Sequence, residues 1–287
     1  MKLRRYRDAR EFEAVTRDFL LRDEAANCLI LGITGDLLNT TLYSDYTPYL
    51  VTVELGGEIV AAALRTPPHN LQLSLAPPEA AALLAADALQ EHADLPGVQG
   101  TEEAGLAFAR EWARITGQRY QPGIPQRIYA LEAVTPPAGV PGELRPATLE
   151  ESDLLLDWLM AFEVAIHGGA PSLDSAARRL SNYFSSSTRG LYVWHDGGPV
   201  SMAGYGGPTP NGIRVGPVYT PPEHRQRGYA SAATASVSQL LLDGGYRHCF
   251  LFTDRDNATT NHIYQEIGYR PVVDVNEYRF VGAPREA

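Results

Sequence analysis

The sequence is poor in cysteine and in positive charge, and each shortage excludes a class of protein. Its 287 residues include only two cysteines, Cys28 and Cys249, which are too few for a zinc site of their own or for a disulfide framework. Acidic residues outnumber Lys and Arg by 34 to 24, and the resulting net charge of −10 argues against binding to a nucleic-acid backbone. We therefore expect neither a metal site nor a nucleic-acid partner.

Long apolar runs are also missing from the chain. No stretch reaches the length that a membrane-spanning helix needs. The first ten residues are charged and lack the apolar core of a secretory signal. We expect a cytoplasmic protein without membrane contact, whose two cysteines are buried and reduced. Nothing in the sequence indicates an oligomeric state.

The residues that are present predict a folded chain of two parts. Hydrophobic residues make up 44% of the chain and charged residues 20%, which is the composition of a globular protein. The length suggests roughly two domains. Residues 135–142, Thr-Pro-Pro-Ala-Gly-Val-Pro-Gly, are dense in helix and strand breakers. They predict a linker between a first domain at 1–134 and a second at 143–287.

The two halves repeat the same plan. Residues 50–64 and 191–205 each read as a β-hairpin around a Gly-Gly turn. In both halves a third strand follows, and then Pro-Pro-Glu, at 77–79 and 221–223, precedes an Ala-rich helix. An internal repeat indicates the architecture twice. The order of strands and helices predicts an α/β fold in which each half is a mixed, mostly antiparallel sheet flanked by helices.

The stretch that carries chemistry runs from Val218 to Tyr269. A strand is expected to end at Thr220, and a helix to begin at about Tyr229 after a short loop. Such a loop directs unpaired backbone N–H groups and the positive end of the helix dipole at one point, which suits a phosphate group. Gly228 allows close approach of the backbone, and two arginines add positive charge. The chain lacks the glycine-lysine pattern of a mononucleotide P-loop and the glycine pattern of a dinucleotide fold.

The motif Arg225-x-x-Gly228-x-Ala230, between a strand and a helix, resembles the pyrophosphate-binding motif of the GNAT superfamily of acyl-CoA-dependent N-acetyltransferases. The motif resemblance covers about residues 143–280, and over residues 1–134 only the layout is similar. It implies two tandem GNAT-like domains, with acetyl-CoA as cosubstrate in the second one. The residues that it implies for cofactor binding are Val218, Tyr219, Thr220, Arg225, Gln226, Arg227, Gly228, Tyr229, Ala230, Ser231, Asn257 and Tyr264.

A later motif of the family is similar to the stretch from Asn257 through Tyr264. There the Asn supports the cofactor arm, and the Tyr lies beside the cofactor sulfur. Tyr264 follows Asn257 by seven positions, a spacing that returns to the same helix face after two turns. The alternative is that Asn257 only caps a helix and that Tyr264 is only a core aromatic residue.

The resemblance implies direct attack of an amine on the thioester in a ternary complex. Tyr264 would donate a proton to the departing thiolate, and backbone N–H groups near Val218 would polarise the carbonyl. The general base is undetermined. Glu163 is a candidate that binds the amine or receives its proton at the end of a water chain, and Glu223 is the other candidate for the end of that chain. A solvated glutamate at a helix end is the alternative for Glu163.

The first half departs from the motif where it matters. Ala80–Leu84 follows Pro77-Pro78-Glu79 directly, with neither glycine nor arginine in between. We therefore expect a degenerate copy that does not bind the cofactor. The predicted function is an N-acetyltransferase acting on a small-molecule amine. The alternatives are a tandem transferase acting on a specialised thiol precursor or a protein amine, and a non-enzymatic acyl-CoA sensor.

Overall fold

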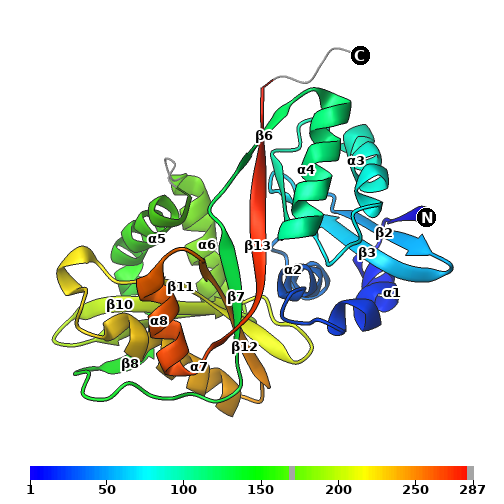
Figure 1. The fold of residues 1–287 in the computed structure, drawn as a ribbon. Helices are drawn as coiled ribbons and strands as arrows, with labels where there is room; N and C mark the ends of the chain where they lie inside the picture. Colours follow the sequence, from blue (N-terminus) through cyan, green and yellow to red (C-terminus); the bar gives the residue numbers. More distant parts are fainter. Residues whose placement is uncertain (168–171, 283–287) are drawn as a thin grey trace. The chain divides into compact units, whose positions relative to one another are not determined.

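The computed structural model describes residues 1–167 and 172–282, and it divides into two compact units (Figure 1). Unit 1 consists of Met1–Arg127 together with the part of the chain that begins at Val273, and unit 2 is Ile128–Val272. Each unit contains a mixed sheet packed against helices, as predicted. No helix among the described residues combines the length and the apolar character that crossing a membrane requires.

The elements of the first half follow one another as a strand, two helices, three strands, a helix, a strand, a helix and a strand. Their bounds are β1 (Lys2–Tyr6), α1 (Ala9–Leu21), α2 (Cys28–Asn39), β2 (Tyr49–Leu55), β3 (Glu58–Arg65), β4 (Leu71–Leu73), α3 (Ala80–Glu91), β5 (Gly97–Thr101), α4 (Glu102–Thr116) and β6 (Arg119–Pro122).

The second half repeats this order after strand β7. Its elements are β7 (Gln126–Leu131), β8 (Glu143–Pro146), the 3-10 turn η1 (Leu149–Glu151), α5 (Ser152–His167), α6 (Leu173–Ser185), β9 (Gly190–His195), β10 (Pro199–Gly206), β11 (Gly212–Tyr219), the 3-10 turn η2 (Pro222–His224), α7 (Tyr229–Asp243), β12 (His248–Asp254), α8 (Ala258–Ile267) and β13 (Arg270–Val281). The predicted repeat is therefore present in the element order.

In unit 1 the strands lie in the order β1-β2-β3-β4-β5-β13, and β6 pairs with β13. The pairs are antiparallel except for β4 with β5. The predicted hairpin is confirmed, because Tyr49 to Leu55 pairs with Arg65 to Glu58 around Gly56 and Gly57. Both glycines have positive φ, which suits a two-residue turn between twisted strands.

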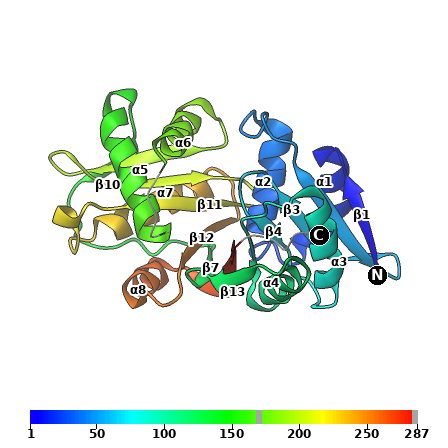
Figure 2. The same cartoon turned by 90° about the horizontal axis from the view of Figure 1, so that it is seen from above.

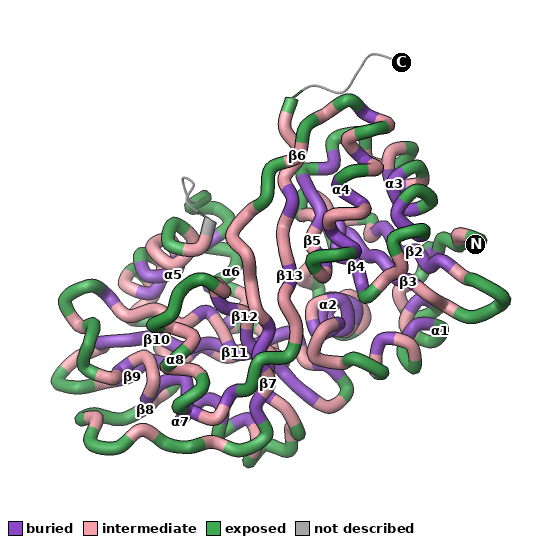
Figure 3. Tube along the Cα trace, viewed as in Figure 1, coloured by how far each residue is buried: buried purple, intermediate pink, exposed green. Residues whose placement is uncertain are grey.

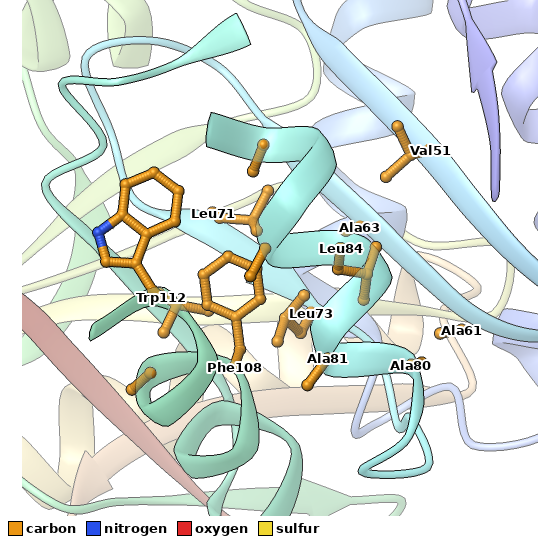
Figure 4. Close-up of a cluster of buried hydrophobic side chains, with 14 of the residues drawn as sticks. Val51, Ala61, Ala63, Leu71, Leu73, Ala80, Ala81, Leu84, Phe108 and Trp112 are labelled. Atoms are coloured by element: carbon orange, nitrogen blue, oxygen red, sulfur yellow. The ribbon is translucent and has the colours of Figure 1, made fainter. Parts of the chain in front are cut away.

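The core of unit 1 is apolar on both faces of its sheet. Against α3 and α4, the strands present Val51, Ala61, Ala63 and Leu71, and the rings of Phe108 and Trp112 pack beside them (Figure 4). On the opposite face, α1 and α2 contribute a second buried cluster. Strand β4 is buried along its length (Figure 3). Burial of both faces explains why these strands read as nearly continuous apolar runs.

In unit 2 the strands lie in the order β8-β9-β10-β11-β12-β7. Neighbouring strands from β8 to β11 are antiparallel, whereas β11 and β12 are parallel. One face of this sheet packs against α7 and the last turn of α8, and the other packs against α5 and α6. Helices α6 and α8 are therefore found on opposite sides of the strands (Figure 2).

The units differ from the predicted division at residues 135–142. The breaker-rich segment is irregular, as expected, but it belongs to unit 2. The N–H of Thr135 donates to Ile267 O at 2.7 Å, and Trp194 Nε1 donates to Pro141 O at 2.8 Å. The chain passes between the units twice, after Arg127 and after Val272. As a result, β7 lies next to β12 in unit 2, while most of β13 lies in unit 1.

Candidate active site

Strands β11 and β12 separate along their length. They pair only from Gly212 to Arg214 on β11, with His248 to Phe250 on β12. Beyond these residues, β11 continues to Tyr219 and β12 continues to Asp254. The facing edges of the two strands therefore carry backbone groups without a strand partner, which is where an extended ligand arm can form hydrogen bonds. Val218 and Tyr219 lie on this open part of β11.

A β-bulge marks the beginning of the open part. Ala203 of β10 pairs with Val218, and Tyr205 pairs with Val215, so Gly204 faces both Gly216 and Pro217. The extra residue bends the strand away from its neighbour. A bulge at this point explains why β11 departs from β12.

The loop before α7 presents a row of backbone N–H groups. Gly228 is the N-cap of α7 with φ +81°, and Gln226 has φ +63°. The first helical hydrogen bond runs from the N–H of Ala232 to Gly228 O at 2.9 Å. No described residue accepts a hydrogen bond from the N–H groups of residues 226–231. These groups lie at the positive end of the helix dipole, an arrangement that binds phosphate.

Side chains hold this loop in place. Arg225 Nε donates to Thr220 O at 3.0 Å, which ties the loop to the end of β11. The hydroxyl of Tyr229 donates to Asp196 Oδ2 at 2.5 Å, which ties the first turn of α7 to the turn between β9 and β10. This hydrogen bond is the main cause that raises the pKa of Tyr229. Arg225 and Arg227 are exposed, so their guanidinium groups can reach an anion at the loop.

The first turn of α7 is small and accessible. Ala230 and Ser231 are half-buried, whereas Tyr229 is buried beneath them. A ligand can therefore lie over Ala230 without displacing a large side chain.

The corresponding helix of unit 1 begins differently. The N–H groups of Ala80 and Ala81 donate to Pro77 O at 2.9 Å and to Pro78 O at 3.1 Å. The residue before the helix, Glu79, is in the right-handed helical region, unlike the left-handed Gly228. These two N–H groups therefore already donate hydrogen bonds to the preceding turn, and they are not available to a phosphate.

Helix α8 carries the other two sequence-predicted residues. Asn257 is its N-cap, and Asn257 Oδ1 accepts from the N–H of Thr260 at 3.2 Å. Tyr264 is half-buried and packs edge-to-face on Tyr269, with ring centroids 6.0 Å apart. Burial raises the pKa of Tyr264 to about 12. The phenol therefore keeps its proton at neutral pH, and its hydroxyl forms no hydrogen bond with a described residue.

A network that the sequence did not indicate holds α8. Asn261 Nδ2 donates to the backbone oxygens of Asp254 at 3.1 Å and Arg255 at 2.8 Å. Asn261 Oδ1 accepts from the hydroxyl of Tyr129 in β7 at 3.1 Å, and Gln265 Nε2 donates to the same hydroxyl at 3.3 Å. The network joins α8 to the end of β12 and to β7. The only local signal was an asparagine inside a helix, which is an uncommon position for this residue.

Glu163 lies on α5, where it forms an ion pair with Arg179 of α6. Its carboxylate is therefore held on the face of the sheet that α5 and α6 cover. Glu223 is exposed in the turn η2, close in sequence to the phosphate loop. Among the described residues, no group of three or more His, Cys, Asp or Glu side chains is arranged to hold a metal ion.

Comparison with known proteins agrees with this arrangement. Residues 153–269 match the model of the acetyltransferase (GNAT) family. No curated protein sequence matches the chain. Residues 153–269 are therefore an acetyltransferase domain of the GNAT family, and this membership supports acyl-CoA-dependent acetyl transfer as the general class of chemistry.

Solved structures with this fold include a GCN5-related N-acetyltransferase from Kribbella flavida, with 19% identity, a TM-score of 0.57, and coverage of 81% of this chain and 90% of that one. A GCN5-related N-acetyltransferase from Sphaerobacter thermophilus has 18% identity and a TM-score of 0.56, with coverage of 97% and 94%. A tandem GNAT protein from the clavulanic acid biosynthesis pathway has 15% identity and a TM-score of 0.57, and the match covers all of both chains. The chain as a whole thus has a tandem GNAT fold.

Proposed function

We propose that unit 2 transfers an acetyl group from acetyl-CoA to the amine of a small molecule while both are bound. The observation that carries this proposal is the row of unpaired N–H groups at residues 226–231, beside the opening between β11 and β12. One feature binds a pyrophosphate and the other accepts an extended arm. The family of residues 153–269 supports the same chemistry.

The chain's own residues supply the binding contacts in this proposal. The N–H groups of residues 226–231 hold the pyrophosphate, and Arg225 and Arg227 neutralise its charge. The pantetheine arm forms hydrogen bonds with the open edge of β11 at Val218, Tyr219 and Thr220. Asn257 lies at the start of α8, on the other side of the arm. The thioester supplies an acyl carbon that an amine can attack.

Three groups then act on the reaction. The amine nitrogen forms a bond to the acyl carbon, and the bond from carbon to sulfur breaks. An N–H of the open edge near Val218 stabilises the negative charge that develops on the carbonyl oxygen. The amine loses its proton to a water chain that ends at Glu163 or Glu223. Tyr264 gives its proton to the departing sulfur and regains one from solvent.

We also propose that unit 1 does not bind acetyl-CoA. The N–H groups at the start of α3 are already used by Pro77 and Pro78. In this proposal its contribution is structural, and it has an apolar core of its own.

Titration calorimetry with CoA and an assay of thiol release with a panel of amines test the function. We expect one site per chain and thiol release that depends on the amine. Gly228→Glu should abolish CoA binding, because it places a carboxylate in the N–H row. Ala230→Glu repeats the test at a position compatible with the helix, in case the first variant folds poorly.

Gly198→Glu is the matched control for these variants, because no atom lies within 4 Å of a Cβ at Gly198 in the exposed turn. It should bind CoA as the wild type does. Two sites per chain, or unchanged binding by Ala230→Glu, would contradict the proposal. CoA binding without thiol release from any amine would favour the non-enzymatic sensor.

A further inference from the structure

Arg214 is a half-buried cation in the middle of strand β11. Its neighbours Ile213 and Val215 pack into the core beneath α7, so Arg214 faces the opposite side, which α5 and α6 cover. It forms no hydrogen bond or ion pair with any described residue. Its Nε atom is buried and has no acceptor. Burying a charged group without a partner is costly, so Arg214 is not explained by stability and is available to an anionic ligand.

Two glycines make room for guanidinium groups at this place. A Cβ on Gly207, which has φ +62°, would lie 2.3 Å from Arg214 Nη2. A Cβ on Gly206 would lie 2.9 Å from Nη1 of a second arginine, Arg189. Two guanidinium groups therefore lie directly against consecutive glycines at the end of β10. A side chain at either glycine would move its arginine.

The surroundings of Tyr183 on α6 show the sign of the local charge. The pKa of Tyr183 is raised by burial, and Arg179, Arg189 and Arg214 all act to lower it. Glu163 is the acid that acts in the other direction, and it is ion-paired with Arg179. Arg214, which has no acidic partner among the described residues, therefore leaves positive charge on this side of the sheet. The hydroxyl of Tyr183 donates to Gly216 O of the bulge at 3.3 Å, which connects this region to the open part of β11.

The position of Arg214 relates it to the proposed reaction. The phosphate loop leads into α7, on one face of the sheet, and a thioester bound there reaches the opening between β11 and β12. Arg214 lies on the other face of the sheet, two residues before the bulge, so an amine that reaches the thioester from that face does so on the side of Arg214.

We propose that the acceptor amine carries a carboxylate, and that Arg214 binds this carboxylate. A guanidinium matches a carboxylate in charge and in planar geometry, with two parallel N–H donors. The inference rests on the proposed acetyl transfer by unit 2, whose acceptor class it specifies as amino acids.

Matched acceptors test the inference. Thiol release from acetyl-CoA is measured with glycine and glycinamide, 4-aminobutyrate and 4-aminobutyramide, and 6-aminohexanoate and 6-aminohexanamide. In the best pair, we expect the acid to exceed the amide at least 10-fold in kcat/KM. Arg214→Gln should lower this value at least 10-fold for the acid and less than 2-fold for the amide. Arg214→Lys should restore part of the preference, because it keeps the charge.

Arg247→Gln is the matched control, since Arg247 is an exposed arginine of the same unit. It removes the same charge and should keep the wild-type preference. CoA affinity should be unchanged in all variants, which shows that the folded cofactor site is intact.

A binding measurement separates this inference from the proposed function. Thermal stability in the presence of CoA is measured with the N-acetyl derivative of each acid and of each amide. The acids should raise the melting temperature in the wild type and not in Arg214→Gln. If no amine releases thiol but this binding difference is found, acetyl transfer fails and the carboxylate site stands. Acids and amides that act alike in both assays, or an acid preference that survives in folded Arg214→Gln, would overturn the inference.

Discussion

At the residue scale, the chemistry of the site depends on whether Tyr264 can give up a proton at the right place. Its ring is half-buried against Tyr269, and the hydroxyl makes no hydrogen bond within the described chain. We expect Tyr264→Phe to lower kcat on the order of 10²-fold, because the acid is lost while the ring is kept. Affinity for CoA, measured by calorimetry, should change little. Full turnover by this variant would leave Tyr264 as a packing residue.

The raised pKa of Tyr264 makes a second prediction, on pH. An ordinary tyrosine loses its proton near pH 10, whereas this one loses it near pH 12. An acid with a raised pKa stays protonated over a wider range, so kcat should not fall between pH 8 and about pH 10.5 through loss of this proton. The measurement is kcat against pH with saturating amine. A fall with an apparent pKa near 10 that is absent from Tyr264→Phe would contradict it.

Residues whose partners are close in sequence were the ones that the sequence could predict. The start of a helix at Tyr229 and the N-cap at Asn257 both depend on a few neighbouring residues, and both are confirmed. The hydrogen bond between Tyr129 and Asn261 joins residues 132 positions apart, so no local pattern could indicate it. The unpaired state of Arg214 was equally hidden, because it depends on which side chains the fold brings near.

At the scale of elements, strand β7 positions helix α8 through the hydroxyl of Tyr129. We expect Tyr129→Phe to lower the free energy of unfolding by about 1–3 kcal/mol, because Asn261 Oδ1 loses its donor. Since α8 carries Tyr264, kcat should fall several-fold, while CoA affinity stays near that of the wild type. Chemical denaturation and steady-state kinetics measure the two effects.

Tyr192→Phe is the control, because Tyr192 is a half-buried tyrosine of unit 2 whose hydroxyl makes no hydrogen bond to a described residue. It should match the wild type in both measurements. Equal effects of the two substitutions would mean that the hydrogen bond does not position α8.

The hairpins and helices that are bounded by glycines could be predicted closely from the sequence. Both Gly-Gly hairpins are present, and α4 and α8 end at left-handed glycines, Gly117 and Gly268. The neighbour of each sheet-edge strand could not be predicted in the same way. A run such as Gln126–Leu131 is suitable for any open edge, and tertiary contacts decide which edge it joins.

At the scale of the whole molecule, the two units cannot be obtained by cutting the chain at the breaker-rich segment. A fragment of residues 143–287 would lack the β7 residues Ile128 to Leu131, of which Tyr129 and Leu131 are buried in the core of unit 2. Each such side chain contributes about 1.5–3 kcal/mol when buried. Loss of both side chains together would therefore remove a large share of the stability of a typical domain.

We therefore expect the fragment 143–287 to aggregate or to melt at a lower temperature than the fragment 128–272, which contains all of unit 2. Circular dichroism during heating and size-exclusion chromatography compare the two. If 143–287 is monomeric and at least as stable as 128–272, the strand residues of β7 are dispensable to unit 2.

The repeat itself was visible in the sequence, since two hairpins, two Pro-Pro-Glu turns and two Ala-rich helices follow one another in the same order. The boundary between the units was not. A cluster of proline and glycine marks where the chain cannot be regular, and here that segment crosses one unit instead of joining two.

The placement of β13 also has a consequence for how a ribosome delivers this protein. The sheet of unit 1 is translated first, yet the strand that completes it beside β5 begins only at Val273. At about 5–20 residues per second, the residues between Arg127 and Val273 take roughly 7 to 30 s to synthesise. During that interval the nascent unit 1 exposes an unpaired strand edge, which is the kind of surface that chaperones protect.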